Sequence, residues 1–191
     1  MALLLFLDTE FTNQNDPKLI SIGLKSANHQ YYNQLKLPKK TFYPPHVSYN
    51  ILPHLNDVYL QQKQLKKSLL QFFMDIKENI YVVSDEIIDL NLFNCVMENK
   101  PINLVGYINI VQYFQNMSQE VWGKDFPHLW ENAGTQLITI FYNYCDLWYQ
   151  YNKLPKHHAF NDASANEFAF YKTEQYLKYP IREVLNNKNR I

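Results

Sequence analysis

An acidic pair follows directly on an apolar run near the start of the chain. Residues 3–7 read LLLFL, and Asp8 and Glu10 come next, separated by one threonine. A membrane span needs about 20 apolar residues and a secretory signal about 7–15, so this shorter run predicts a buried β-strand. Residues two apart on a strand point to the same face, with Cα atoms roughly 6–7 Å apart. The two carboxylates should therefore lie side by side at the carboxyl end of the strand, where ligands gather in open α/β sheets.

Two neighbouring carboxylates on a buried strand suit a divalent cation. Burying unpaired carboxylates is costly, and Mg²⁺ prefers oxygen ligands. A site with two cations requires several carboxylates in a small volume. The alternative is a solvated strand end, or an acid pair bridged to lysines. The Asp-x-Glu spacing alone leaves both interpretations open.

A second stretch, HHAFNDA at 157–163, combines a histidine with a carboxylate. Asn161 is a candidate cap for a helix, and the helix dipole would favour the carboxylate of Asp162. Residues five apart on one helix do not share a face. Pro155, however, places His157 ahead of the helix, from where its imidazole can fold back toward the same cleft. A neutral histidine is suited to act as a general base; the alternative is a surface histidine doublet in a loop.

A third stretch, SDEIIDLNLF at 84–93, offers two more aspartates. Asp85 and Asp89 are four apart and would share a face of a helix. Asp85 is the more natural cap or first-turn acid, whereas Asp89 stands among apolar residues. Metal binding would explain an acid in so apolar a segment, and exposure on the outer helix face would explain it equally.

Composition and charge narrow the class of protein. The 191 residues carry a net charge of zero, and only two of the 18 basic residues are arginines. This balance argues against a long electrostatic footprint on duplex nucleic acid, but not against a small site for a few nucleotides. Cys95 and Cys145 lack metal-site spacing, so we expect a reduced, cytoplasmic protein.

The elements that must position these residues follow from hydrophobic periodicity. Strands and helices in the expected order predict one α/β domain over residues 1–191, with a mixed sheet covered by helices. The Pro-rich stretch 41–55 resists regular structure, and the first three strands suggest an antiparallel meander. The expected strands are 2–7, 19–24, 29–35, 80–84 and 102–106. One expected helix runs from Asn56 or Asp57 to residue 77, and the others span 85–98, 134–152 and 161–176.

Taken together, the three acidic stretches resemble the DnaQ-like 3′–5′ exonucleases of the DEDDh type. The first family motif, D-x-E, is matched by LDTEFT at Asp8 and Glu10, and the middle aspartate is best matched by Asp89. The third motif, H-x-A-x-x-D-A, is matched by HHAFNDA, whose spacing selects His157 and Asp162. LDTEFT followed by PKLISIGL is most similar to the small exoribonucleases related to RNase AS and RNase T. The implied fold is the ribonuclease H-like α/β fold, a mixed five-stranded sheet with an antiparallel meander and two parallel strands, flanked by helices.

The resemblance also implies a mechanism with two Mg²⁺ or Mn²⁺ ions about 3.5–4 Å apart. Asp8 would bridge the ions, Glu10 and Asp162 would complete the first site, and Asp89 would anchor the second through water. His157 would take the proton of the attacking water. The expected activity is a 3′–5′ exoribonuclease that releases nucleoside 5′-monophosphates from single-stranded RNA. The alternatives are a 3′–5′ exodeoxyribonuclease and an inactive nucleic-acid-binding module; a glycosidase with paired carboxylates would leave HHAFNDA without a role.

Substrate and partner contacts are expected beside the same motif. Thr9, Phe11 and Thr12 would lie against the terminal nucleotide, with Phe11 as a stacking platform worth about 1–3 kcal/mol. The competing interpretation of Phe11 is an ordinary core residue. Related exoribonucleases are commonly homodimers, and the aromatic segment around Trp122 and Trp130 is a candidate interface. No membrane partner is expected.

Overall fold

The molecule is built on a five-stranded mixed sheet with the strand order β3-β2-β1-β4-β5. We analysed a computed structural model, which describes residues 2–37, 43–98, 100–122 and 130–177. The first three strands pair antiparallel, and β4 and β5 continue the sheet in parallel to β1. Three antiparallel and two parallel strands flanked by helices confirm the α/β sheet expected from the sequence. The strands are β1 (Leu3–Phe11), β2 (Leu19–Lys25), β3 (Gln30–Gln34), β4 (Ile80–Ser84) and β5 (Leu104–Asn109).

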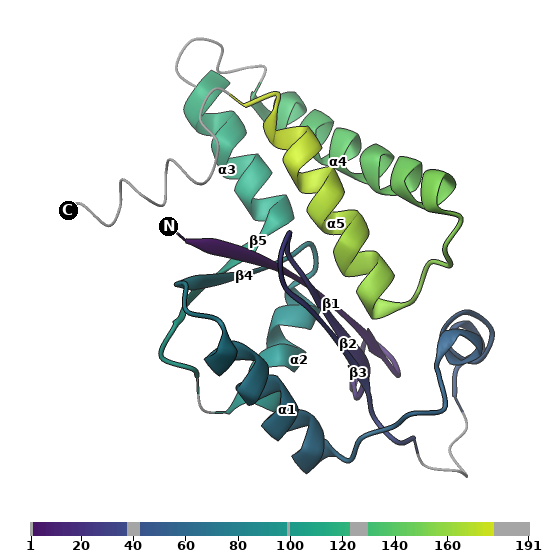
Figure 1. Ribbon diagram of the computed structural model, residues 1–191. Helices are drawn as coiled ribbons and strands as arrows, with labels where there is room; N and C mark the ends of the chain where they lie inside the picture. Colours follow the sequence, from purple (N-terminus) through teal and green to yellow (C-terminus); the bar gives the residue numbers. More distant parts are fainter. Residues whose placement is uncertain (1, 38–42, 99, 123–129, 178–191) are drawn as a thin grey trace.

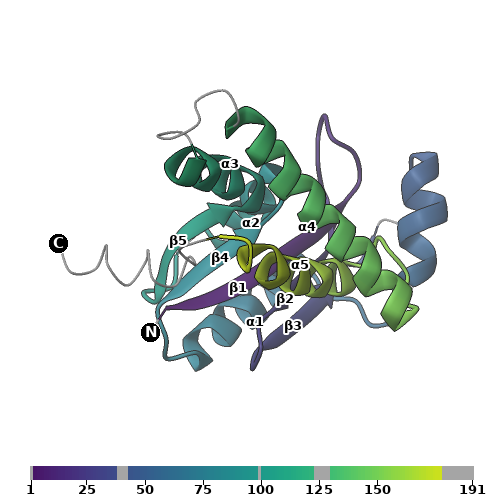
Figure 2. The same cartoon turned by 90° about the horizontal axis from the view of Figure 1, so that it is seen from above.

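Helices cover both faces of this sheet (Figure 1). On one face lie α1 (Gln62–Asp75) and α2 (Ile87–Met97). On the other lie α3 (Ile110–Trp122), α4 (Trp130–Asn152) and α5 (Ala159–Glu174), which overlie the strands when seen from above (Figure 2). None of the helices in the described part of the chain combines the length and the apolar content that a membrane crossing requires.

Alternate residues of β1 enter two different cores. Leu5 and Leu7 pack with the side chains of α1 and α2, whereas Leu4 and Phe6 pack with those of α3, α4 and α5. A strand buried on both faces is continuously apolar, which explains the run LLLFL. The even-numbered series continues with Asp8 and Glu10, so both acids face the side of the sheet that α5 covers.

Gly23 allows α5 to begin close to the acidic pair. It lies opposite Asp8 in the β1–β2 register. A Cβ at position 23 would lie 2.4 Å from the backbone carbonyl of Ala159, the first residue of α5. Only glycine tolerates so close a backbone approach. The start of α5 therefore packs directly on β2, next to Asp8.

Several local predictions are wrong at the edges of these elements. The first helix begins at Gln62, because Asn56 does not cap it but hydrogen-bonds with Gln34 on β3 through its backbone. The stretch 41–55 is not irregular throughout, since it contains a π-helical turn (Val47–Ile51) and a 3₁₀ turn (Leu52–His54). The helix α3 was not expected from the sequence.

The remaining boundaries differ from the predictions by a few residues. β1 extends through its two acids to Phe11, α2 begins after Asp85, and β5 is shifted toward its carboxyl end. α4 begins earlier than expected. α5 also begins earlier, since His158 rather than Asn161 stands at its N-cap. The strand predicted over 80–84 is confirmed.

Candidate active site

A cleft of about 810 Å³ opens where β1 and β4 end and α2 and α5 begin. Its lining is strongly acidic, and Lys156 is the single lysine that lines it in the described part of the chain. The ammonium group of Lys156 already pairs with the carboxylate of Asp146 at 2.6 Å. A cleft with this charge attracts cations and repels a bare polyanion. The seven lining carboxylates belong to Asp8, Glu10, Asp85, Glu86, Asp89, Asp146 and Asp162.

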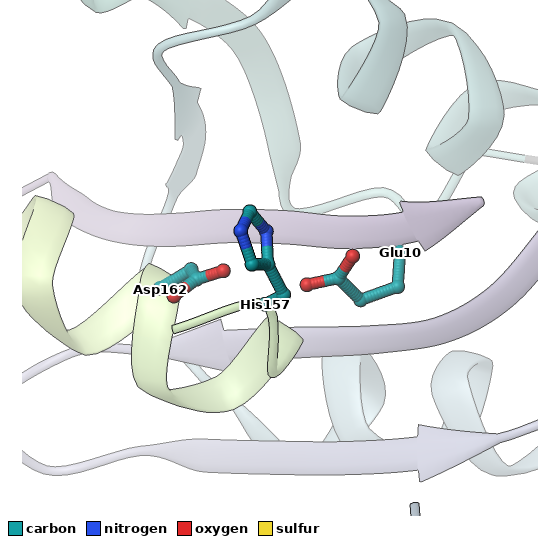
Figure 3. Close-up of side chains that lie close together, drawn as sticks. All are labelled: Glu10, His157 and Asp162. Atoms are coloured by element: carbon teal, nitrogen blue, oxygen red, sulfur yellow. The ribbon is translucent and has the colours of Figure 1, made fainter. Parts of the chain in front are cut away.

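One group of side chains in the cleft joins Glu10, His157 and Asp162. Glu10 extends from β1, Asp162 from the first turn of α5, and His157 from the loop before that helix. One ligand atom from each residue lies within 4.8 Å of the other two. Figure 3 shows the imidazole between the two carboxylates. The structure thus brings together residues 10, 157 and 162, as the resemblance of the sequence motifs implies.

The backbone at His157 is in the left-handed conformation, with φ of +59°. This conformation costs an L-residue roughly 1–2 kcal/mol. A hydrogen bond stabilises this turn, since Asn161 Nδ2 donates to the carbonyl of Pro155 at 3.0 Å. The carbonyl of His158 then accepts the N–H groups of Asn161 and Asp162. Such local strain is typical of functional sites, and here it directs the imidazole toward Glu10.

A second group joins Asp8, Asp85 and Asp89, whose nearest oxygens also lie within 4.8 Å of one another. Asp89 lies in the first turn of α2 and is only 2% exposed. Its Oδ1 accepts hydrogen bonds from the N–H of Thr9 at 3.2 Å and the hydroxyl of Thr9 at 2.6 Å. Its Oδ2 accepts the hydroxyl of Ser84 at 2.8 Å. Asp85 lies outside the helix, contrary to the prediction, and yet both aspartates reach Asp8.

Burial and mutual repulsion raise the pKa values of these carboxyl groups. Burial is the largest cause of the raised pKa for each of them, and for Asp8 the charges of Asp89 and Asp162 are the next largest. The pKa of Glu10 rises to about 9, through burial and then the charge of Asp162. Burial raises the pKa of Asp89 to about 7 despite the hydrogen bonds from Thr9, and that of Asp85 to about 6. The pKa of Asp162 is raised as well, against the effect of its hydrogen bond with Tyr149.

One direct observation indicates that these groups could hold a divalent cation. Glu10 is 6% exposed, and its Oε1 is buried with no hydrogen-bond partner in the described part of the chain. An unpartnered buried carboxylate oxygen is expensive unless something positive binds it. Carboxylate oxygens are the ligands that Mg²⁺ and Mn²⁺ prefer. Glu10 and Asp162 could hold one cation, and Asp8 with its neighbouring aspartates a second.

The residues predicted to bind substrate occupy different environments. Thr9 is buried, and its described side-chain contact is with Asp89. Phe11 lines the cleft but also packs against the core beneath α1 and α2, so both interpretations of it fit its position. Thr12 does not line the cleft; it holds the β1–β2 turn by accepting the N–H of Lys18 at 3.1 Å. The side chains of Trp122 and Trp130 fall outside the described residues.

Two residues that the sequence analysis did not identify organise the acids. The hydroxyl of Tyr149, on α4, donates a hydrogen bond to Asp162. Asn166 Nδ2 donates one to Asp85 Oδ1 at 2.7 Å. Asn166 follows Asp162 by one helical turn, and this spacing could have indicated it. Tyr149 had no local signal, because it reaches the site from a different helix.

Pro44, His46 and Ile51, from the stretch with the two helical turns, also line the cleft. Comparison of the chain with protein-family models and with curated proteins finds no match. The interpretation of the cleft therefore depends on its geometry and on the sequence motifs.

Proposed function

We propose that this protein is a metal-dependent 3′–5′ exoribonuclease with the ribonuclease H-like fold. The observation that carries the proposal is the meeting of Glu10, His157 and Asp162 beside an unpartnered, buried carboxylate oxygen. Its product would be nucleoside 5′-monophosphates from the 3′ end of single-stranded RNA. A second group of carboxylates next to the first supports a site for two cations rather than one.

The cations would activate water and neutralise the charge of the scissile phosphate when bound. Glu10 and Asp162 would hold the first, and Asp8 with the neighbouring aspartates the second. The exposed imidazole of His157 would take the proton of the attacking water and pass it to solvent. Burial raises the pKa of Asp162, and the nearby imidazole of His157 opposes that rise.

The net charge of the chain and its sequence motifs support single-stranded RNA as the substrate. The chain has no net charge, and among the described residues one lysine lines the cleft, which argues against a long electrostatic footprint on duplex nucleic acid. The cleft is lined by Phe11, Pro44, His46 and Ile51 among others, and a volume of about 810 Å³ would hold one or a few nucleotides. The choice of RNA over DNA rests on the similarity of LDTEFT and PKLISIGL to small exoribonucleases.

The test uses matched 5′-labelled single-stranded RNA and DNA, with Mg²⁺ or Mn²⁺ and with a chelator as control. We expect a ladder that shortens from the 3′ end, is stronger on RNA, and disappears with chelator. A stronger ladder on DNA would keep the chemistry and change the substrate to that of a repair or proofreading exonuclease. Binding of RNA without cleavage, in both metals, would favour an inactive nucleic-acid-binding module.

A further inference from the structure

A second groove in the surface lies on the far side of α5 from the acidic cleft. Its volume is about 480 Å³, and α5, the β2–β3 hairpin and one side chain of α4 border it. We infer that this groove, here called the α5 groove, binds a stretch of single-stranded nucleic acid. It lies outside the proposed cation site, and binding there goes beyond the proposed cleavage and does not require it. The lining residues used below are Lys25, Trp148, Phe160, Phe168, Tyr171 and Lys172.

Helical spacing places the α5 groove and the acidic cleft on opposite faces of α5. An α-helix turns by about 100° per residue. Asp162 and Asn166 therefore share the face that lines the cleft. Phe160, Phe168 and Tyr171 share the opposite face, and all three line the groove. The helix, which lies beside α4 (Figure 2), thus separates two surfaces of the molecule.

The groove side of α5 is rich in aromatic residues. A surface helix normally presents polar residues on the side away from its core. Here the rings of Phe160 and Tyr171 are partly exposed, and Phe168 is 36% exposed. Trp148 reaches the same groove from α4. Partly exposed aromatic rings that gather in one groove indicate a binding surface.

Two lysines give the α5 groove a positive charge. Lys25 Nζ lies 6.0 Å from the ring centroid of Phe160, and Lys172 Nζ lies 5.7 Å from that of Phe168. Neither ammonium group forms an ion pair with a carboxylate in the described ranges of the chain. Glu167 is the one acid in the described lining, so the groove and the acidic cleft carry opposite charges. Both ammonium groups can therefore pair with phosphates.

Aromatic rings beside such lysines suit single-stranded nucleic acid. Unpaired bases of any sequence stack on aromatic rings, while the lysines contact the phosphates. In a duplex the bases already stack on one another, and two lysines would neutralise little of its backbone. The lining extends from Phe160 to Gln175, about 22 Å along the helix. This length suits an extended strand. The alternative occupant is a second copy of this chain, and the experiment distinguishes the two.

The experiment measures binding of a fluorescein-labelled oligouridine of about 12 nucleotides by fluorescence anisotropy. Chelator is present, so the RNA is not cleaved, and without cations the acidic cleft repels it. Phe168→Leu should weaken binding by about fivefold or more, because leucine keeps an apolar side chain but cannot stack on a base. Tyr151→Leu is the matched control, since that ring is 88% exposed on α4 and does not line the α5 groove.

The two lysines predict a change in salt dependence. Replacing Lys25 and Lys172 together with alanine should reduce the slope of log affinity against log salt by about 1.4. Each phosphate contact with a single strand contributes about 0.7 to that slope. The control pair is Lys63→Ala with Lys67→Ala, which removes the same charge from exposed positions on α1. An equal change of slope in both pairs would show that net charge alone attracts the RNA, and would overturn the inference.

Two further results would overturn the inference. One is a wild-type chain that does not bind the oligouridine in the presence of chelator. The other is a Phe168→Leu chain that binds RNA as the wild type does but loses self-association in sedimentation. That second result would make the α5 groove an interface between copies. Neither result decides whether RNA is cleaved from its 3′ end in the presence of Mg²⁺ or Mn²⁺, so this inference and the proposed function fail separately.

Discussion

At the scale of single residues, His157 carries the most specific prediction. Replacing His157 with alanine should lower kcat on single-stranded RNA by about 10²–10⁴-fold, the usual contribution of a general base. The number of bound Mn²⁺ ions should stay the same, because the carboxylates remain. Steady-state kinetics with calorimetry checks both. The control is His29→Ala, on the turn between β2 and β3 and outside the cleft; equal losses in both variants would contradict the role of His157.

Tyr149 carries a second prediction at this scale. Tyr149→Phe removes the hydroxyl that binds Asp162. We expect Mn²⁺ affinity at the first site to fall by about 10–100-fold, the usual effect of losing a residue that orients a ligand. Calorimetric titration measures it. Tyr151→Phe on the same helix is the control, because that ring is 88% exposed and does not line the cleft. Unchanged affinity in Tyr149→Phe would show that Asp162 needs no such support.

Local spacing in the sequence accounts for much of the site, and long-range contacts account for the rest. The two acids of β1, and the histidine and aspartate around the start of α5, lie within short motifs that fix their relative directions. The surroundings of Asp89 and Asp85 depend on hydrogen bonds from Thr9 and Asn166, which are 80 and 81 residues away in the chain. No spacing rule within one segment reports such contacts.

At the scale of elements, Gly23 sets how closely α5 approaches the sheet. Gly23→Ala would place a Cβ 2.4 Å from the backbone of Ala159, so α5 must move. We expect a loss of about 1–3 kcal/mol in the free energy of unfolding, typical of overpacking, together with weaker Mn²⁺ binding. Urea unfolding and calorimetry measure the two effects.

Gly106→Ala is the matched control for Gly23→Ala. Its added Cβ meets the ring of Tyr81 at 3.1 Å, and a side chain can yield where a backbone cannot. A Gly23→Ala chain as stable as Gly106→Ala, with full cation affinity, would show that the position of α5 is not critical.

A helix or strand could be predicted from the sequence where one local signal, such as a short apolar run, dominated. The strand over 80–84 is short and apolar, and its prediction is confirmed. The helix α3 was missed although Asn109 caps it by accepting the N–H of Gln112, and Ile110, Phe114 and Met117 have helical spacing. Its aromatic and β-branched residues favour strands by propensity, and packing against α4 outweighs that preference.

At the scale of the whole molecule, the metal-free protein should lose stability as the pH rises. The folded pKa values of Asp85, Asp89 and Glu10 are raised to about 6, 7 and 9. A carboxyl group whose pKa is raised in the folded protein contributes its full stabilisation below the pKa it has in the unfolded chain, near 4. That contribution is lost as the pH rises through the pKa of the folded state. Melting temperatures with chelator should therefore fall between about pH 5 and 9.

Mn²⁺ should reverse this loss. A ligand at about 100 times its Kd adds about 2.7 kcal/mol of stability, and deprotonated carboxylates bind it best. The rise in Tm on adding Mn²⁺ should therefore be larger at pH 8 than at pH 5. The double variant Asp8→Asn, Glu10→Gln should flatten both trends. An equal rise at the two pH values would contradict a cation held by these acids.

The two hydrogen bonds that span 80 and 81 residues also bear on the order of folding. One joins the first strand to the start of α2, and the other joins the end of β4 to α5. Closing such long loops costs entropy before any contact repays it, so non-local contacts form slowly. We therefore expect the carboxylates to come together only when α5 docks on the sheet. Under the proposed function, a chain still emerging from the ribosome would be unable to cut the RNA around it until α5 has folded.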